Sequence, residues 1–124
     1  MTTRNPVGWF EIYVQDMARA KRFYETVLGL TLDRLEVDAL EMWAFPMVMD
    51  AAGASGSLVK AEGVPSGGNS TLVYFNCADC AVEAGRVAAA GGTLVREKFS
   101  IGQYGFVALA QDTEGNMIGL HSIQ

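Results

Sequence analysis

The feature that most constrains the fold of this chain is an internal repeat, in which three short motifs recur in the same order at an offset of 62 or 63 residues. Self-similarity at one fixed period is typical of a duplicated structural unit. A chance match is the alternative, because helices that begin after Asp and end at Gly are common, but three matches favour a duplication. The matched motifs are Asp16 with Asp79, residues 29–32 (GLTL) with 91–94 (GGTL), and residues 50–53 (DAAG) with 112–115 (DTEG).

Each half of the chain predicts one strand, one helix and three further strands. Residues 9–14 are rich in aromatic and β-branched side chains, which indicates the first strand. Asp16 is a suitable N-cap for a helix over residues 17–28, in which apolar side chains recur at helical spacing, and Gly29 ends it. The remaining predicted strands are 31–34, 41–48, 57–60, 71–76, 93–96, 105–110 and 117–122, and the second predicted helix is 80–90.

The segment 62–69 has no hydrophobic period and is rich in Gly, Pro and Ser, so it predicts a connector between the two halves. We therefore expect one domain over residues 1–124, with module one at 7–61, the linker at 62–69 and module two at 70–124. Hydrophobic residues make up 50% of the chain and charged residues 19%, which is typical of a globular domain and excludes a disordered one. The predicted fold class is α+β, built from two βαβββ modules in tandem.

Charge and cysteine content limit the partners of the protein. Nine basic and fourteen acidic residues give a net charge of −5, which disfavours binding to nucleic acid. No apolar run approaches the roughly 18 residues that cross a bilayer, and the first residues lack the apolar core of a signal peptide. Two cysteines are too few for a disulfide framework. We expect a soluble cytoplasmic protein that binds neither nucleic acid nor a membrane.

Two stretches resemble the vicinal oxygen chelate superfamily, which includes glyoxalase I, bleomycin resistance proteins and extradiol dioxygenases. Residues 14–30 (VQDMARAKRFYETVLGL) resemble its first strand-and-helix signature, and residues 112–120 (DTEGNMIGL) resemble its closing turn and last strand. Residues 8–12 (GWFEI) look most like small bacterial proteins described as glyoxalase-like or related to lactoylglutathione lyase. The resemblance implies a curled mixed sheet around a cleft, a small-molecule ligand and a homodimer.

The same resemblance implies four positions for side chains that bind a divalent metal, on the first and last strands of each module. None of the residues at these positions has a carboxylate, imidazole or thiolate with which to bind Mg, Mn, Fe, Ni or Zn. We therefore expect no cofactor and no catalytic metal. An improvised site formed by Glu11 and His121 is the alternative. The four positions are Trp9, Gly56, Leu72 and Gly119.

Glu11 and His121 are the candidate catalytic residues. If Glu11 faces the cleft beside Trp9 and Tyr13, desolvation would suit it to act as a general base or to bind a substrate amine. A solvated or Arg-paired Glu11 on a sheet edge is the alternative. His121 is the single histidine and would exchange protons near neutrality, unless it lies at a frayed strand end.

The candidate ligand-binding residues lie on or near strands that could face the cleft. A lining of aromatic side chains favours a flat apolar or aromatic ligand, although aromatic residues on strands also fill cores. Residues 99–104 correspond to a loop that the resemblance places over the cleft as a lid. The candidate ligand-binding residues are Trp9, Tyr13, Trp43, Leu72, Tyr74, Tyr104 and Gly119.

Cys77 and Cys80 have the C-x-x-C spacing of redox and zinc sites, but the chain lacks a thioredoxin-like context and further zinc ligands. We expect both thiols at a strand end or in the core.

The predicted function is the binding of a small apolar or aromatic molecule in a cleft without metal. The alternatives are a lyase or isomerase with Glu11 as general base, a metal-dependent glyoxalase or dioxygenase, and an interaction module without a cavity.

Overall fold

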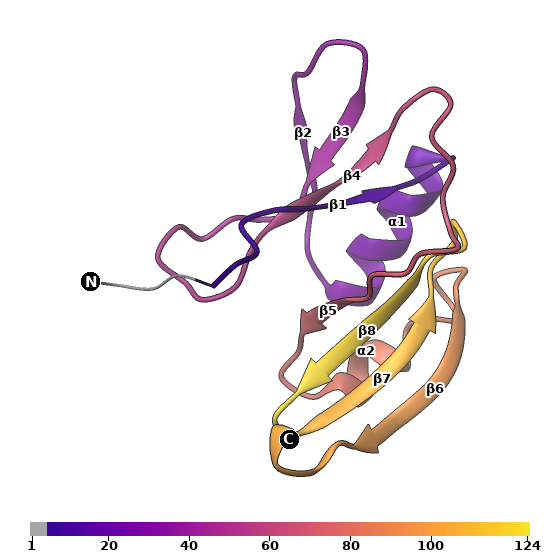
Figure 1. Ribbon diagram of the computed structural model, residues 1–124. Coiled ribbons are helices and arrows are strands. Elements are labelled where there is room, and N and C mark those ends of the chain that lie inside the picture. Colours follow the sequence, from indigo (N-terminus) through magenta and orange to yellow (C-terminus); the bar gives the residue numbers. More distant parts are fainter. Residues whose placement is uncertain (1–4) are drawn as a thin grey trace.

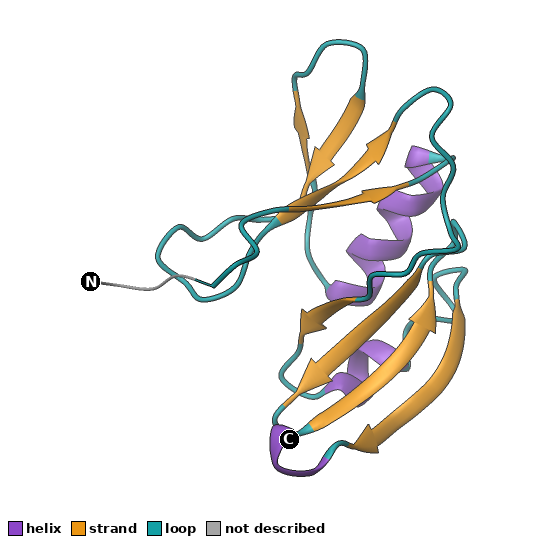
Figure 2. Cartoon of the chain, viewed as in Figure 1, coloured by secondary structure: helices purple, strands orange, loops and turns teal. Residues whose placement is uncertain are grey.

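The computed structural model describes residues 5–124 and shows the element order βαβββ twice (Figures 1 and 2). This order confirms the predicted α+β fold with two similar modules. Module one contains β1 (Phe10–Tyr13), α1 (Met17–Leu28), β2 (Asp33–Leu35), β3 (Glu41–Ala44) and β4 (Gly56–Lys60). Module two contains β5 (Val73–Asn76), α2 (Cys80–Ala84), β6 (Thr93–Ser100), the 3-10 helix η1 (Gly102–Tyr104), β7 (Phe106–Gln111) and β8 (Met117–Ser122).

The strands form two four-stranded mixed sheets, with the orders β1-β4-β3-β2 and β5-β8-β7-β6. In each sheet the first strand of the module pairs in parallel with the last, and the other neighbours are antiparallel. β1 and β5 are therefore edge strands, and the two sheets stay separate in the described part of the chain. Figure 2 shows the linker as a long loop that runs from β4 to β5 beside both sheets.

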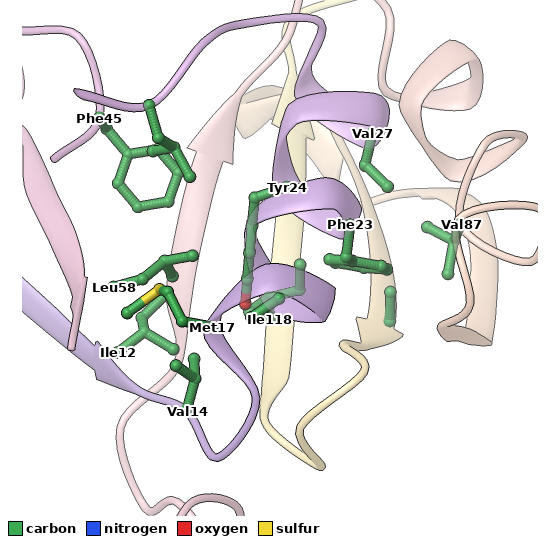
Figure 3. Close-up of a cluster of buried hydrophobic side chains, with 13 residues drawn as sticks. Ile12, Val14, Met17, Phe23, Tyr24, Val27, Phe45, Leu58, Val87 and Ile118 are labelled. Atoms are coloured by element: carbon green, nitrogen blue, oxygen red, sulfur yellow. The ribbon is translucent and has the colours of Figure 1, made fainter. Parts of the chain in front are cut away.

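One face of α1 supplies the core that the two modules share. Tyr24 and Phe23 of α1 are fully buried, and the aromatic rings of Tyr24 and Phe23 meet edge to face. Figure 3 shows Ile118 of β8 beside Tyr24, whereas Ile12 and Leu58 lie on the side of sheet one. Because a single helix buries its apolar face against both sheets, the same packing holds the two modules together.

α2 is shorter than the sequence predicts. The prediction was a helix over residues 80–90, but the helix ends at Ala84 and residues 85–91 form turns. Gly85 follows at once, and glycine is a poor helix former. The next hydrogen bonds reach back only three residues, as from the N–H of Arg86 to the carbonyl oxygen of Glu83. Val87 is nevertheless fully buried in the shared core.

Two strands also differ in length from the prediction. β3 ends at Ala44 rather than at residue 48, because Pro46 has no N–H group for a sheet ladder. β6 extends to Ser100 through irregular pairing with β7 and takes up the beginning of the predicted lid segment. In the part of the chain that the structure describes, no helix is long and apolar enough to cross a bilayer.

Candidate functional site

A cleft of about 380 Å³ lies where the edge strand β1 meets the linker and the beginning of β8. Six of its lining residues have apolar side chains, and the volume is at the lower end of the range for clefts that bind small molecules. The cleft therefore has the size and the walls to bind a small apolar molecule. The lining residues are Phe10, Glu11, Ile12, Tyr13, Pro65, Ser66, Gly67, Asn69, Thr71, Val73, Asn116, Met117 and Ile118.

Glu11 and Tyr13 are the polar side chains that β1 contributes to the cleft. They lie on one face of the strand because side chains two residues apart point the same way, and the Tyr13 hydroxyl donates to Glu11 Oε1 at 3.0 Å. This hydrogen bond, together with burial and the carboxylate charge, raises the pKa of Tyr13. Tyr13 is therefore a protonated donor at neutral pH. Glu11 itself is exposed to solvent on the edge strand β1, so the structure has the solvated Glu11 of the alternative and not a desolvated one.

The turn between β7 and β8 holds module one in place beside the cleft. Glu114 Oε1 accepts hydrogen bonds from the N–H groups of Gln15 and Asp16 at 2.8 and 2.9 Å. Its Oε2 accepts from Arg19 Nε at 2.7 Å and from the Thr113 hydroxyl at 2.9 Å. Burial alone would raise the pKa of Glu114, but these hydrogen bonds outweigh it and lower the pKa to about 2.

The same turn fixes the walls of the cleft. Asn116 donates from Nδ2 to the carbonyl oxygen of Tyr13 at 3.0 Å and accepts from the N–H of Gly67 at 2.7 Å. Asp112 accepts from the hydroxyl of Tyr24, whose pKa is raised by burial and by the Asp112 charge. The sequence analysis identified residues 112–116 only as part of a closing turn before the last strand. The turn in fact connects β1, α1 and the linker, which the sequence did not reveal.

The module-two candidates form a second group on sheet two. Tyr74 and Gly119 are partners in the β5–β8 register, and a Cβ atom on Gly119 would overlap the Tyr74 ring, so this ring covers Gly119. His121 Nε2 donates to the carbonyl oxygen of Tyr104 at 2.7 Å. His121 is not a lining residue of the cleft and lies roughly 10 Å along β8 from the cleft residue Ile118, at about 3.3 Å per residue. The structure therefore does not bring His121 to the cleft with Glu11.

The other predicted ligand-binding residues lie outside this cleft. Trp43 is on the helix side of sheet one, where its indole Nε1 donates to Glu41 at 3.1 Å and Lys21 Nζ lies 4.8 Å from the ring centroid. Trp9 precedes β1 with 36% of its surface exposed, and the half-buried Leu72 precedes β5. Of the seven predicted ligand-binding residues, Tyr13 is the one that lines the cleft, and a binding role for the others stays a prediction.

The strand registers correct one of the four metal positions expected from the sequence. Glu11 pairs with Ser57 as Tyr74 pairs with Gly119, so Ser57, not Gly56, is the module-one counterpart of Gly119. A Cβ atom on Gly56 would overlap the Phe10 ring on the opposite face, because a shift of one residue reverses the direction of a strand side chain. The Ser57 hydroxyl is fully buried and has no hydrogen-bond partner among residues 5–124.

The side chains at the four corrected positions do not fit a catalytic metal ion. Two are apolar, one is glycine and one is a serine hydroxyl, whereas such sites use carboxylate, imidazole or thiolate groups. Within residues 5–124, no three His, Cys, Asp or Glu side chains are grouped so that they could bind an ion. The corrected positions are Trp9, Ser57, Leu72 and Gly119.

The two cysteines lie away from the cleft. Cys77 is half-buried just after β5, and Cys80 is fully buried in a small core beside α2. Burial raises the pKa of Cys77 to about 12, with a further contribution from the charge of Glu83. A thiol with this pKa is protonated at neutral pH and is a poor nucleophile and metal ligand.

Comparison with known proteins identifies the family. Residues 7–120 match the family described as "Glyoxalase/Bleomycin resistance protein/Dioxygenase superfamily". The chain therefore belongs to this superfamily, as the resemblance in its sequence indicated. A relative from Mycobacterium tuberculosis (strain CDC 1551 / Oshkosh), named "Putative glyoxylase CFP32", is 32% identical over 107 residues, which are 86% of this chain and 40% of the relative.

Solved structures show the same fold at lower sequence identity. Glyoxalase I from Zea mays matches 98% of this chain and 47% of its own chain, with a TM-score of 0.74 and 21% identity. A glyoxalase/bleomycin resistance protein from Albidiferax ferrireducens T118 matches 94% of this chain and 98% of its own, with a TM-score of 0.70 and 20% identity. This chain thus spans less than half the length of the mycobacterial and maize proteins.

Proposed function

We propose that this chain is a glyoxalase-like protein that binds a small apolar or aromatic molecule in the cleft between β1, the linker and β8, without a catalytic metal. The observation that carries the proposal is the cleft of about 380 Å³ with apolar walls on both modules. Burial of apolar ligand surface would provide most of the binding free energy. The chemistry of the four metal positions supports the metal-free part of the proposal.

Binding of 2-naphthalenemethanol, a neutral aromatic probe, tests the cleft. We expect saturable binding by isothermal titration calorimetry, and loss of binding in Thr71→Trp, because Thr71 is an exposed lining residue and an indole there would fill the cleft. Thr31→Trp, at an exposed site outside the lining, is the matched control and should bind as the wild type does. Equal binding by both variants would contradict the proposal.

Elemental analysis of the purified protein tests the metal-free part of the proposal. We expect no stoichiometric metal, and no rise in melting temperature when Ni, Zn, Mn or Mg is added. A stoichiometric metal, or a rise in melting temperature that a chelator reverses, would contradict this part. Such a result would instead favour a metal-dependent glyoxalase or dioxygenase.

A lyase or isomerase reaction with Glu11 as general base is the second candidate function. The Tyr13 hydroxyl beside Glu11 favours it, because a carboxylate with a neighbouring proton donor can take a proton and return it. The solvent exposure of Glu11 favours binding over proton abstraction. If Glu11→Gln binds 2-naphthalenemethanol normally but loses a lyase or isomerase activity that the wild type shows, the enzyme function is supported.

The homodimer and the cytoplasmic location expected from the sequence are part of the same proposal. Sedimentation equilibrium tests the assembly, and we expect a mass of twice the 13.3 kDa of the chain. A monomer at all accessible concentrations would contradict the homodimer without affecting the cleft.

A further inference from the structure

We infer that the cleft selects a ligand with a positively charged group, such as an alkylammonium, that pairs with Glu11. This inference rests on the proposed function and adds the charge of the ligand to it. Among the described residues that line the cleft, Glu11 alone is charged. The other lining residues are uncharged, so the charge of Glu11 is the main electrostatic feature that a ligand would meet there.

The Glu11 carboxylate is oriented but not neutralised. The hydrogen bond from the Tyr13 hydroxyl holds Oε1, and a hydroxyl donor leaves the full negative charge in place. A carboxylate has more acceptor sites than this one bond uses. A ligand ammonium could therefore donate to Glu11 without displacing Tyr13, and charge-assisted hydrogen bonds of this kind are stronger than neutral ones.

Each described basic side chain that forms an ion pair does so with an acidic side chain other than Glu11. Arg19 pairs with Glu114, Lys21 with Glu25, Arg34 with Glu36 and Lys98 with Asp79. No basic side chain of residues 5–124 forms an ion pair with Glu11. The net charge of −5 adds a long-range attraction for cations. A cationic ligand would thus supply the charge that residues 5–124 do not place beside Glu11.

The walls around Glu11 define the rest of the ligand. Phe10, Ile12 and Val73 are partly or fully buried apolar residues of β1 and β5, and Met117 and Ile118 of β8 also line the cleft. A molecule that satisfied both features would have an apolar or aromatic body and one ammonium group. An anionic ligand would meet repulsion from Glu11 and would have no cationic partner among the lining residues.

Three probes with one aromatic body test this inference: 2-naphthylmethylamine, 2-naphthalenemethanol and 2-naphthoate. By calorimetry at pH 7 and low salt, we expect the amine to bind about tenfold more tightly than the alcohol, the size of one charge-assisted hydrogen bond, and the carboxylate to bind most weakly. Sodium chloride at 0.5 M should reduce the preference for the amine, because the pair is exposed to solvent.

Two variants with the same change in net charge complete the test. Glu11→Gln should bind the amine and the alcohol with equal affinity, whereas Glu62→Gln, at an exposed acid outside the lining, should keep the wild-type preference. If the alcohol binds wild type as tightly as the amine, the inference is overturned and the proposed function stands. If none of the three probes binds, both are overturned. Equal loss of preference in both variants would also overturn the inference.

Discussion

Two turns occupy the same place in the two modules and behave differently. The turn at residues 50–53 is exposed, and no side-chain hydrogen bond of Asp50 occurs within the described residues. In the matching turn, Asp112 and Glu114 are buried, and Glu114 alone accepts four hydrogen bonds, three of them from module one. A repeated motif can therefore keep its place between the same two strands of each module while only one copy acquires the contacts that join the modules.

The matched strand pairs show a similar difference. In module one Glu11 lies opposite Ser57, which places two polar side chains on one face of sheet one. In module two Tyr74 lies opposite Gly119 and covers it. Glu11, which belongs to the polar pair, lines the cleft, whereas Tyr74 does not. The two modules thus share topology, while module one supplies the charged side chain of the cleft and the turn of module two holds module one in position.

Among the changes that test this comparison, removal of the Glu114 carboxylate is expected to have the largest effect on the free energy of unfolding. Glu114→Ala leaves the N–H groups of Gln15 and Asp16 and the guanidinium of Arg19 without their acceptor, and should lower the free energy of unfolding by about 3 kcal/mol. Asp50→Ala, in the exposed turn, should change it by less than about 0.5 kcal/mol. Urea denaturation measures both, and equal losses would show that the turns are equivalent after all.

The pH dependence of stability gives the next largest effect. The pKa of Glu114 is about 2 in the folded chain against a usual 4.5, so its stabilising contribution is present above pH 4.5 and is lost as the pH falls towards 2. Allowing for the solvent exposure of Arg19, we expect a loss of about 2 kcal/mol across this window. Urea midpoints from pH 6 to 2 should fall more steeply for wild type than for Glu114→Gln, and parallel curves would contradict this.

A methyl group on Gly119 tests how the Tyr74 ring covers module two. Gly119→Ala should lower the free energy of unfolding by about 1.5 kcal/mol, because the new Cβ atom displaces the ring. Tyr74 is 47% exposed, so its ring can move outward. The double variant Tyr74→Ala, Gly119→Ala should therefore be no less stable than Tyr74→Ala, and an additive loss would place the strain elsewhere.

Ser57 is the module-one counterpart of Gly119, and a substitution to alanine there should raise the free energy of unfolding instead of lowering it. Ser57→Ala removes a buried hydroxyl without a partner among the described residues and should raise the free energy of unfolding by about 1 kcal/mol. Ser122→Ala is the matched control, because the buried Ser122 hydroxyl accepts from the N–H of Cys80 and donates to the carbonyl of Gln124. It should lose about 1 kcal/mol, and equal losses at both serines would indicate a partner for Ser57.

The fold could be predicted from the sequence because its signals are local. The Asp16 cap, the apolar spacing of α1 and the C-cap at Gly29 appear as expected, with Gly29 in the left-handed region at φ 66°. The exact end of α2 could not be predicted, because the low helix propensity of Gly85 favours an end there whereas the apolar spacing of the residues that follow favours a longer helix. The metal position predicted on β4 was wrong by one residue, at Gly56 instead of Ser57, because only the pairing of β4 with β1 shows which residues share a face.

The candidate site was harder to predict because it depends on contacts between distant residues. Glu11 and Tyr13 were singled out from the alternation along one strand, but the linker residues 65–69 were treated only as a connector. The hydrogen bonds of Glu114 and Asn116 to residues 13–19 span about a hundred positions along the chain. A high density of polar residues in one turn, as in residues 112–116, was the one signal that could have indicated such contacts.

Methyl NMR with 2-naphthalenemethanol tests the central claim most directly, namely that the ligand site lies where β1, the linker and β8 meet. We predict concentration-dependent shifts for the methyl groups of Ile12, Val73 and Ile118, and no shift for Val107, which pairs with His121 on sheet two. Shifts confined to Val107 and its neighbours, with none at Ile12 and Ile118, would contradict the account and place the site on sheet two.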